Sequence, residues 1–163
     1  MSFGLAAFTL FHVALSLIAI VTGLAWVLEL LRQKLPNRWT TVFLATTALT
    51  SITGFFFPFH QLLPSHILGA ISLVVLAIAY FALYGRELAG SWRISFVAAS
   101  VVALYLNVFV LVVQLFRRVP ALRALAPTQT EGPFKVTQLT VLILFIVVGI
   151  LAATRSRNQL RTA

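Results

Sequence analysis

Three histidines are the side chains of this chain best suited to bind a metal ion or a cofactor. His12 and His66 stand in separate apolar segments, so their imidazoles could bind the iron of haem b from both faces. Gly69, close to one helical turn after His66, would let a flat ring approach the backbone. A second hypothesis is a zinc or copper site made of His12, His60, His66 and Glu131, because imidazole and carboxylate groups are ligands for these metals. The spacing matches no metal-binding motif, so histidines with a structural or interfacial role are the competing interpretation.

Two amides within an apolar segment form a second candidate site. Asn107 and Gln114 are seven residues apart, which places them on one face of a helix. The surrounding residues are mainly Val, Leu, Phe and Ala, and polar groups at membrane depth are costly and commonly functional. We therefore predict that Asn107 and Gln114 line a cofactor-binding pocket together with His12 and His66.

The cysteines and acidic residues that most catalytic sites require are scarce. The chain has no Cys and no Asp, and its three Glu are Glu29, Glu87 and Glu131. This composition excludes disulfides and thiolate nucleophiles, and it argues against carboxylate pairs, Walker-type magnesium sites and Ser-His-Asp triads. Glu29 stands three residues before Arg32, a spacing typical of an ion pair on a helix. The sequence neither assigns nor excludes an enzymatic activity.

The composition is that of an integral membrane protein. Hydrophobic residues make up 61% of the chain and charged residues 9%, whereas a soluble domain is about half apolar and about a quarter charged. The net charge of +9 would suit nucleic acid, but the basic residues are scattered at the ends of apolar segments, which is typical of a membrane topology signal. We expect one transmembrane domain over residues 1–163, with the lipid bilayer and not nucleic acid as its partner.

Five apolar runs are long enough to cross a hydrocarbon layer of about 30 Å. They cover about residues 3–31, 39–57, 65–84, 91–116 and 134–154, with an outer loop over 117–133. Backbone polar groups in lipid must bond within their own segment, which predicts an all-α polytopic transmembrane bundle. Ala19 and Gly23, four residues apart, are typical of closely packed membrane helices.

The distribution of Lys and Arg predicts the orientation. One side of the membrane would carry eight of them: Arg32, Lys34, Arg38, Arg86, Arg93, Arg155, Arg157 and Arg161. The other side would carry four: Arg117, Arg118, Arg123 and Lys135. We therefore expect the N-terminus outside and the C-terminus in the cytoplasm, with the histidines, Asn107, Gln114 and the last loop toward the outer face. Trp26, Trp39 and Trp92 would lie in an interfacial aromatic belt.

The second predicted span is unusually polar. Its hydroxyl side chains follow one broad side: Thr46, Thr47, Thr50, Ser51 and Thr53. Such hydroxyls bond back to helix carbonyls, which predicts a dry packing face, with a hydrated path as the alternative. The GFFFPF stretch over 54–59 that ends this span is either a lipid-facing anchor or an aromatic wall beside a flat apolar ligand such as a quinone.

The last outer loop is long, basic and rich in proline. The VPALRALAP stretch predicts a short interfacial helix with Pro120 at its start. Thr128 and Glu131 have the spacing of a capping box, but Gly132-Pro133 should interrupt the helix that would follow. Glu131 is expected at the positive end of the last helix or paired with an arginine. The arginines either extend to lipid phosphates or belong to a lid or docking surface.

Three stretches, TSITGFFFPF, ALYLNVFVLVVQ and ALAPTQTEGPF, carry a resemblance. The chain resembles an uncharacterised family of small bacterial five-span inner-membrane proteins. This resemblance implies bacterial origin and the inner membrane, and it assigns no functional residue.

Three classes of function fit these features. The preferred hypothesis is a membrane protein that binds haem, a metal or a quinone-like molecule in an outer-face polar pocket. The alternatives are an accessory or structural subunit that docks on another membrane complex through its outer loop, and a small transporter component that uses the hydroxyl-rich second span. The sequence supports transport least, since it contains no inverted repeat and few ionisable groups.

Overall fold

The computed structural model describes residues 3–32, 35–57 and 64–162. These residues form six α-helices and one short π-helix. The elements are α1 (Phe3–Leu31), α2 (Arg38–Gly54), α3 (Pro64–Tyr80), η1 (Phe81–Gly85), α4 (Trp92–Arg118), α5 (Pro120–Leu125) and α6 (Gly132–Thr162). The predicted all-helical architecture is confirmed.

Four helical stretches are long and apolar enough to cross a membrane: Gly4–Leu31, His66–Gly85, Trp92–Arg118 and Gly132–Arg157. The fifth predicted crossing is not confirmed. The segment predicted over 39–57 corresponds to α2, which has 17 residues. At a rise of about 1.5 Å per residue it is about 26 Å long, shorter than the hydrocarbon layer of about 30 Å.

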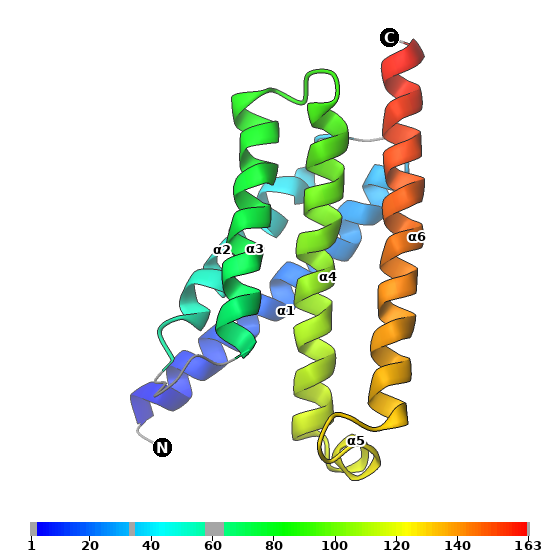
Figure 1. Ribbon diagram of the computed structural model, residues 1–163. Coiled ribbons are helices and arrows are strands. Elements are labelled where there is room, and N and C mark those ends of the chain that lie inside the picture. The colour runs from blue at the N-terminus through cyan, green and yellow to red at the C-terminus, as the bar shows by residue number, and fades with distance from the viewer. Residues whose placement is uncertain (1–2, 33–34, 58–63, 163) are drawn as a thin grey trace.

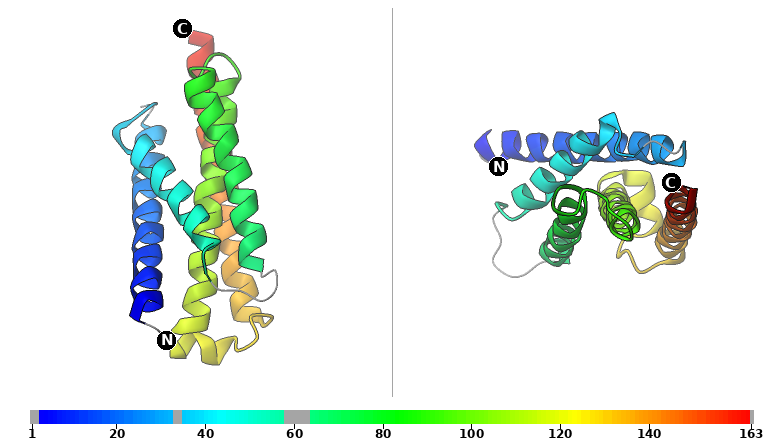
Figure 2. Two further views of the ribbon diagram at one scale, coloured as in Figure 1. Left: turned by 90° about the vertical axis from the view of Figure 1, so that its left-hand side faces the viewer. Right: turned by 90° about the horizontal axis from the view of Figure 1, so that it is seen from above.

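The helices form two layers (Figures 1 and 2). α3, α4 and α6 run side by side with α4 in the middle, and α1 crosses obliquely behind them with α2 beside it. α1, α2, α3, α4 and α6 run in alternating directions, so the N-terminus and the C-terminus lie at opposite ends of the bundle. We call these the α5 end, where α1 begins and α5 lies, and the C-terminal end.

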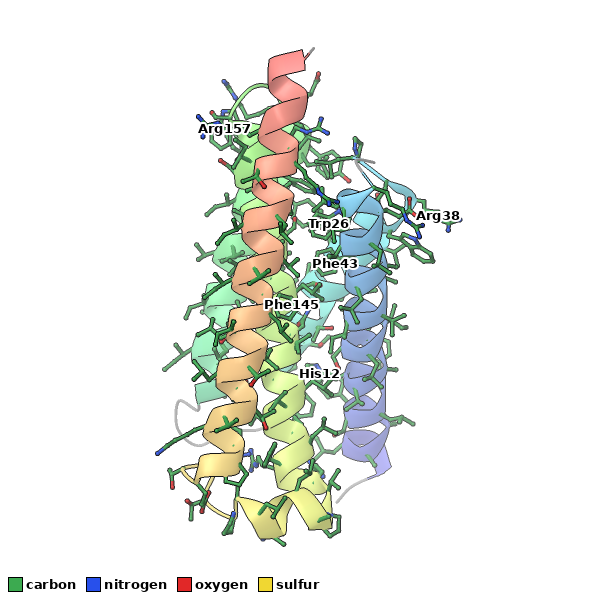
Figure 3. The ribbon with its side chains drawn as sticks, turned by 90° about the vertical axis from the view of Figure 1, so that its right-hand side faces the viewer. His12, Trp26, Arg38, Phe43, Phe145 and Arg157 are labelled. Carbon is green, nitrogen blue, oxygen red and sulfur yellow. The ribbon has the colours of Figure 1, made fainter. Side chains whose placement is uncertain are left out.

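The centre of the bundle is an aromatic cluster around Trp26. This side chain is fully buried, stacks on Phe43 of α2 at 5.6 Å between ring centroids, and meets the edge of Phe96 of α4 at 5.9 Å. Figure 3 shows Trp26 and Phe43 between α1 and the other layer. The prediction that Trp26 belongs to an interfacial belt is therefore wrong. It lies five residues before the end of α1, where the oblique course of this helix brings it against α4.

Gly23 brings α1 close to its neighbours. A Cβ added at this residue would lie 2.5 Å from Cδ1 of Leu104 and 2.9 Å from the ring of Phe43. Ala19, one turn earlier, is fully buried. The predicted small-residue packing of the first helix is confirmed at these two residues, because a larger side chain would hold the helices apart.

The C-terminal end is held by hydrogen bonds from polar side chains. Asn37 caps α2: its side chain accepts from the Trp39 N–H at 3.0 Å, while Thr40 Oγ1 accepts from the Asn37 N–H at 3.1 Å. Arg155 of α6 donates to the carbonyl of Leu31, the last residue of α1. These contacts fix the start of α2 and the end of α1 against the rest of the bundle.

The loop predicted over 117–133 is largely helical. α4 continues to Arg118, and α5 begins at Pro120, as predicted for a short helix in this loop. No helix follows Thr128 directly, as predicted, and the last helix, predicted from about residue 134, begins at Gly132. Proline is tolerated in the first turn of a helix because the N–H groups there have no partner within the helix.

Candidate functional site

His12 of α1 is held by a hydroxyl of α2. Its Nδ1 lies 2.8 Å from Oγ1 of Thr53. That hydroxyl donates its single hydrogen to the carbonyl of Leu49 at 2.7 Å, with a second carbonyl, that of Thr50, at 3.2 Å. With its hydrogen on the Leu49 carbonyl, Thr53 accepts the hydrogen bond that His12 donates. In this arrangement the imidazole carries its hydrogen on Nδ1, and Nε2 keeps a lone pair for a ligand.

The turn that follows α2 connects the two histidines within the described residues. Phe57 meets the His12 ring edge-on at 5.1 Å, and Phe55 packs on the His66 ring at 5.8 Å. His66, in the first turn of α3, is buried. The structure thus brings His12 and His66 to the two sides of one aromatic turn. We call His12, Thr53, Phe55, Phe57 and His66 the histidine site.

The aromatic segment after α2 contains both an exposed ring and rings that pack on the histidines. Phe56 is 70% exposed, as a lipid-facing anchor would be, whereas Phe55 and Phe57 pack on the imidazoles. Gly69 was expected to admit a flat ring, and a Cβ there would lie 3.1 Å from the ring of Phe55. The flat ring beside Gly69 is therefore a side chain of the protein. Residues 58–59 lie outside the described part of the chain.

Glu131 lies apart from these rings, at the start of α6. Its carboxylate accepts hydrogen bonds from the hydroxyl of Thr128 at 2.8 Å and from the N–H groups of Thr128 and Thr130 at 3.1 and 3.0 Å. Partial desolvation raises the pKa of Glu131, but these hydrogen bonds outweigh it and lower the pKa below the ordinary value. The expected place at the positive end of the last helix is confirmed, with threonines as its partners.

The metal hypothesis required four residues. His60 lies outside the described residues, and among those described no three His or Glu side chains form a group that could hold a metal. A site that includes His60 stays a prediction.

The two predicted amides lie in different surroundings. Asn107 donates from Nδ2 to Oγ1 of Thr47, which is fully buried, at 3.1 Å. Gln114 is exposed. Both residues belong to α4, which α2 crosses obliquely (Figure 1). Asn107 is therefore a contact between helices, and its partner is a hydroxyl of the polar second helix.

Two other glutamines, Gln129 and Gln138, form hydrogen bonds to α4 that the sequence does not predict. Gln129 donates from Nε2 to the carbonyl of Val113 at 2.9 Å, and Gln138 donates to the carbonyl of Phe109 at 3.2 Å. Sequence patterns did not reveal these pairs because their acceptors are backbone carbonyls of a regular helix, which no residue type marks.

The hydroxyls of α2 are mostly bonded to their own helix. Thr46 donates to the carbonyl of Val42 at 2.7 Å, and Ser51 donates to that of Thr47 at 2.9 Å. Ser51 Oγ also lies 3.0 Å from the hydroxyl of Ser72 of α3. This arrangement fits the predicted dry packing face, and through it α2 binds α1, α3 and α4.

A basic cleft lies at the α5 end. It encloses about 420 Å³ and is lined by Arg117 and Arg118 of α4, Arg123 of α5, and Thr128 and Gln129 of the following loop. We call it the arginine cleft.

A second cleft, of about 550 Å³, lies at the C-terminal end. It is lined by residues of both charges, Glu29 and Arg38, beside Pro36 and Asn37. Glu29 also forms the predicted ion pair with Arg32 at 3.5 Å. The two clefts thus differ in charge balance.

Comparison with known proteins gives no family, because no family model, no curated protein and no solved structure matches this chain. The candidate sites rest on the geometry alone.

Proposed function

We propose that the protein is a five-span protein of the bacterial inner membrane that binds a small redox or apolar ligand through the imidazole of His12 near the outer face. The ligand class is haem b, a metal centre or a quinone-like molecule. The observation that carries this proposal is the hydrogen bond between His12 Nδ1 and Thr53, which leaves Nε2 available to a ligand.

Histidines that bind metals or haem have the same second contact. Their other ring nitrogen donates to a fixed acceptor, which sets the tautomer and the orientation of the ring. The Thr53 hydroxyl can serve as that acceptor, because its own hydrogen can bond to the carbonyl of Leu49 in α2. The same lone pair of Nε2 would accept a hydrogen bond from the hydroxyl of a reduced quinone.

The membrane orientation is supported by the described cations. Six of them lie at the C-terminal end: Arg32, Arg38, Arg86, Arg93, Arg155 and Arg157. Four lie at the α5 end: Arg117, Arg118, Arg123 and Lys135. The positive-inside tendency favours the C-terminal end in the cytoplasm. As a fifth span, α2 would turn Thr53 and Ser51 toward α1 and α3 and leave its exposed apolar side chains, Val42, Leu49 and Ile52, to the lipid.

The test is the absorption spectrum, metal content and extracted ligands of the protein purified in mild detergent. We expect a bound chromophore, metal or quinone in the wild type and its loss in His12→Ala. Thr53→Val should weaken retention, because the imidazole loses the hydrogen bond that orients it. Thr46→Val is the matched control, since its hydroxyl bonds only within α2. A wild-type preparation without chromophore, metal or extractable ligand would overturn the proposal, as would full retention in His12→Ala.

A further inference from the structure

We propose that the arginine cleft binds the headgroup of a membrane lipid that carries a phosphate monoester, in the leaflet at the α5 end. This site is separate from the histidine site, and the proposal requires only that the bundle lies in a membrane. A lipid headgroup and a soluble anion could both supply a multiply charged phosphate, and we propose the lipid.

The three arginines come from two elements that the fold holds together. Arg117 and Arg118 are the last residues of α4, and Arg123 lies on α5. The loop that follows is tied to α4 by the hydrogen bond from Gln129 to the carbonyl of Val113. These residues therefore line the cleft on a constrained backbone and not on a free loop.

Hydrophobic packing fixes α5 beneath the end of α4. Ala126, directly after α5, is fully buried in a small cluster with Val112 and Phe116 of α4, and Leu122 packs against this cluster. α5 is six residues long and too short to be stable alone, so this packing determines its direction. Arg123 is consequently held on the same side as the arginines of α4.

The cleft carries an excess of positive charge. The nearest carboxylate in the sequence, Glu131, is bonded to Thr128 and Thr130. Within the described chain, the recorded ion pair joins Glu29 and Arg32 at the opposite end. Three guanidinium groups that have no carboxylate partner among the described residues would attract an anion of more than one charge. Arg matches phosphate oxygens with paired N–H donors.

The surroundings of the cleft suit a lipid better than a soluble anion. Leu125 follows Arg123 on α5 and is 57% exposed, and Leu115, just before the arginines of α4, is 40% exposed. An anion in the cleft would thus lie next to a helix whose apolar side chains face the acyl chains. A phosphate monoester carries up to two negative charges, whereas a phosphodiester lipid carries one, so the three arginines favour the monoester.

The test uses the full-length protein in nanodiscs of phosphatidylcholine with a small fraction of phosphatidic acid or of phosphatidylglycerol. Binding is measured by native mass spectrometry of the released complex. We expect preferential retention of phosphatidic acid and a loss of about tenfold or more in Arg117→Gln/Arg118→Gln/Arg123→Gln, the size expected when charge-assisted hydrogen bonds are removed. Lys135→Gln is the matched control, because it removes a charge at the same end but does not line the cleft.

Three outcomes would overturn the proposal. Equal retention of phosphatidylglycerol would mean that the cleft does not distinguish the monoester. An equal loss in Lys135→Gln would mean that only the summed charge of this end matters. Displacement of phosphatidic acid by inorganic phosphate or pyrophosphate at equal concentration would assign the cleft to a soluble anion.

Replacement of the three arginines by lysine keeps the charge, and we expect intermediate retention of phosphatidic acid in this variant. The lysine variant also tests the site if the glutamine variant does not fold.

Discussion

Two parts of the interior hold α1 against the other helices in different ways. Toward the C-terminal end, Trp26 and Gly23 pack against the rings and methyl groups of Phe43 and Leu104. Toward the α5 end, His12 contacts α2 through a hydrogen bond to Thr53 and through the ring of Phe57. The first contact depends on the close fit of apolar side chains, which contributes to stability. The second depends on the orientation of the imidazole, which matters for the proposed ligand binding.

Removal of Trp26 should have the largest effect on stability. Trp26→Ala should destabilise the protein by about 3–5 kcal/mol, because it leaves a cavity between Phe43 and Phe96. Trp26→Phe should cost less, since the indole N–H is buried without a hydrogen-bond partner and is removed with the ring. Denaturant titration in detergent micelles would measure both. Equal losses in the two variants would show that the packing of the aromatic cluster is not the source of stability.

Gly23 tests the close approach within the same region. Gly23→Ala should destabilise the bundle by about 1–3 kcal/mol, since its Cβ would meet Leu104 and Phe43 at distances that require repacking. Gly4→Ala is the control, because nothing lies within 4 Å of a Cβ there. The measurement is the same titration. Stability that is unchanged in Gly23→Ala would mean that α1 moves away from α4 without loss.

Asn107 tests the polar part of the interior. Asn107→Leu removes the hydrogen bond to Thr47 and should cost about 0.6–2 kcal/mol, the range measured for hydrogen bonds between membrane helices. The loss should be smaller than that of Trp26→Ala and should leave ligand retention at His12 largely intact. If Asn107→Leu abolished ligand retention at unchanged stability, Asn107 would belong to the binding site, as the sequence predicts.

The sequence predicted the helices better than their contacts. Hydropathy and length indicate α1, α3, α4 and α6, because each segment must keep its own backbone bonded in lipid. The same patterns placed Trp26 at the interface and could not show that Asn107, unlike the exposed Gln114, contacts α2. Both results have one cause: α1 and α2 run obliquely to the other layer (Figure 2), and a periodic pattern contains no information about the angle at which helices cross.

The histidine site could be predicted only in part. The sequence pointed to His12 and His66, because imidazoles are rare at membrane depth. It gave no reason to pair Thr53 with His12, since 41 residues separate them and threonine is common on this helix. A hydroxyl whose hydrogen is held by its own helix becomes an acceptor for a neighbouring helix, and only the packing of α1 on α2 determines which threonine meets the ring.

Substitution of Glu131 should have the smallest effect on stability. It tests the loop before α6, whereas the substitutions above test the interior. The folded-state pKa of Glu131 is lowered from the ordinary value of 4.5 by the hydrogen bonds from Thr128 and Thr130, which outweigh desolvation. Its contribution to stability is therefore present above pH 4.5 and is lost as the pH falls through the lower folded-state pKa. Glu131→Gln should flatten this part of the pH dependence of the unfolding midpoint, while His12→Ala should leave it unchanged. An unaltered slope in Glu131→Gln would mean that the threonine hydrogen bonds do not distinguish the charged carboxylate from the neutral one.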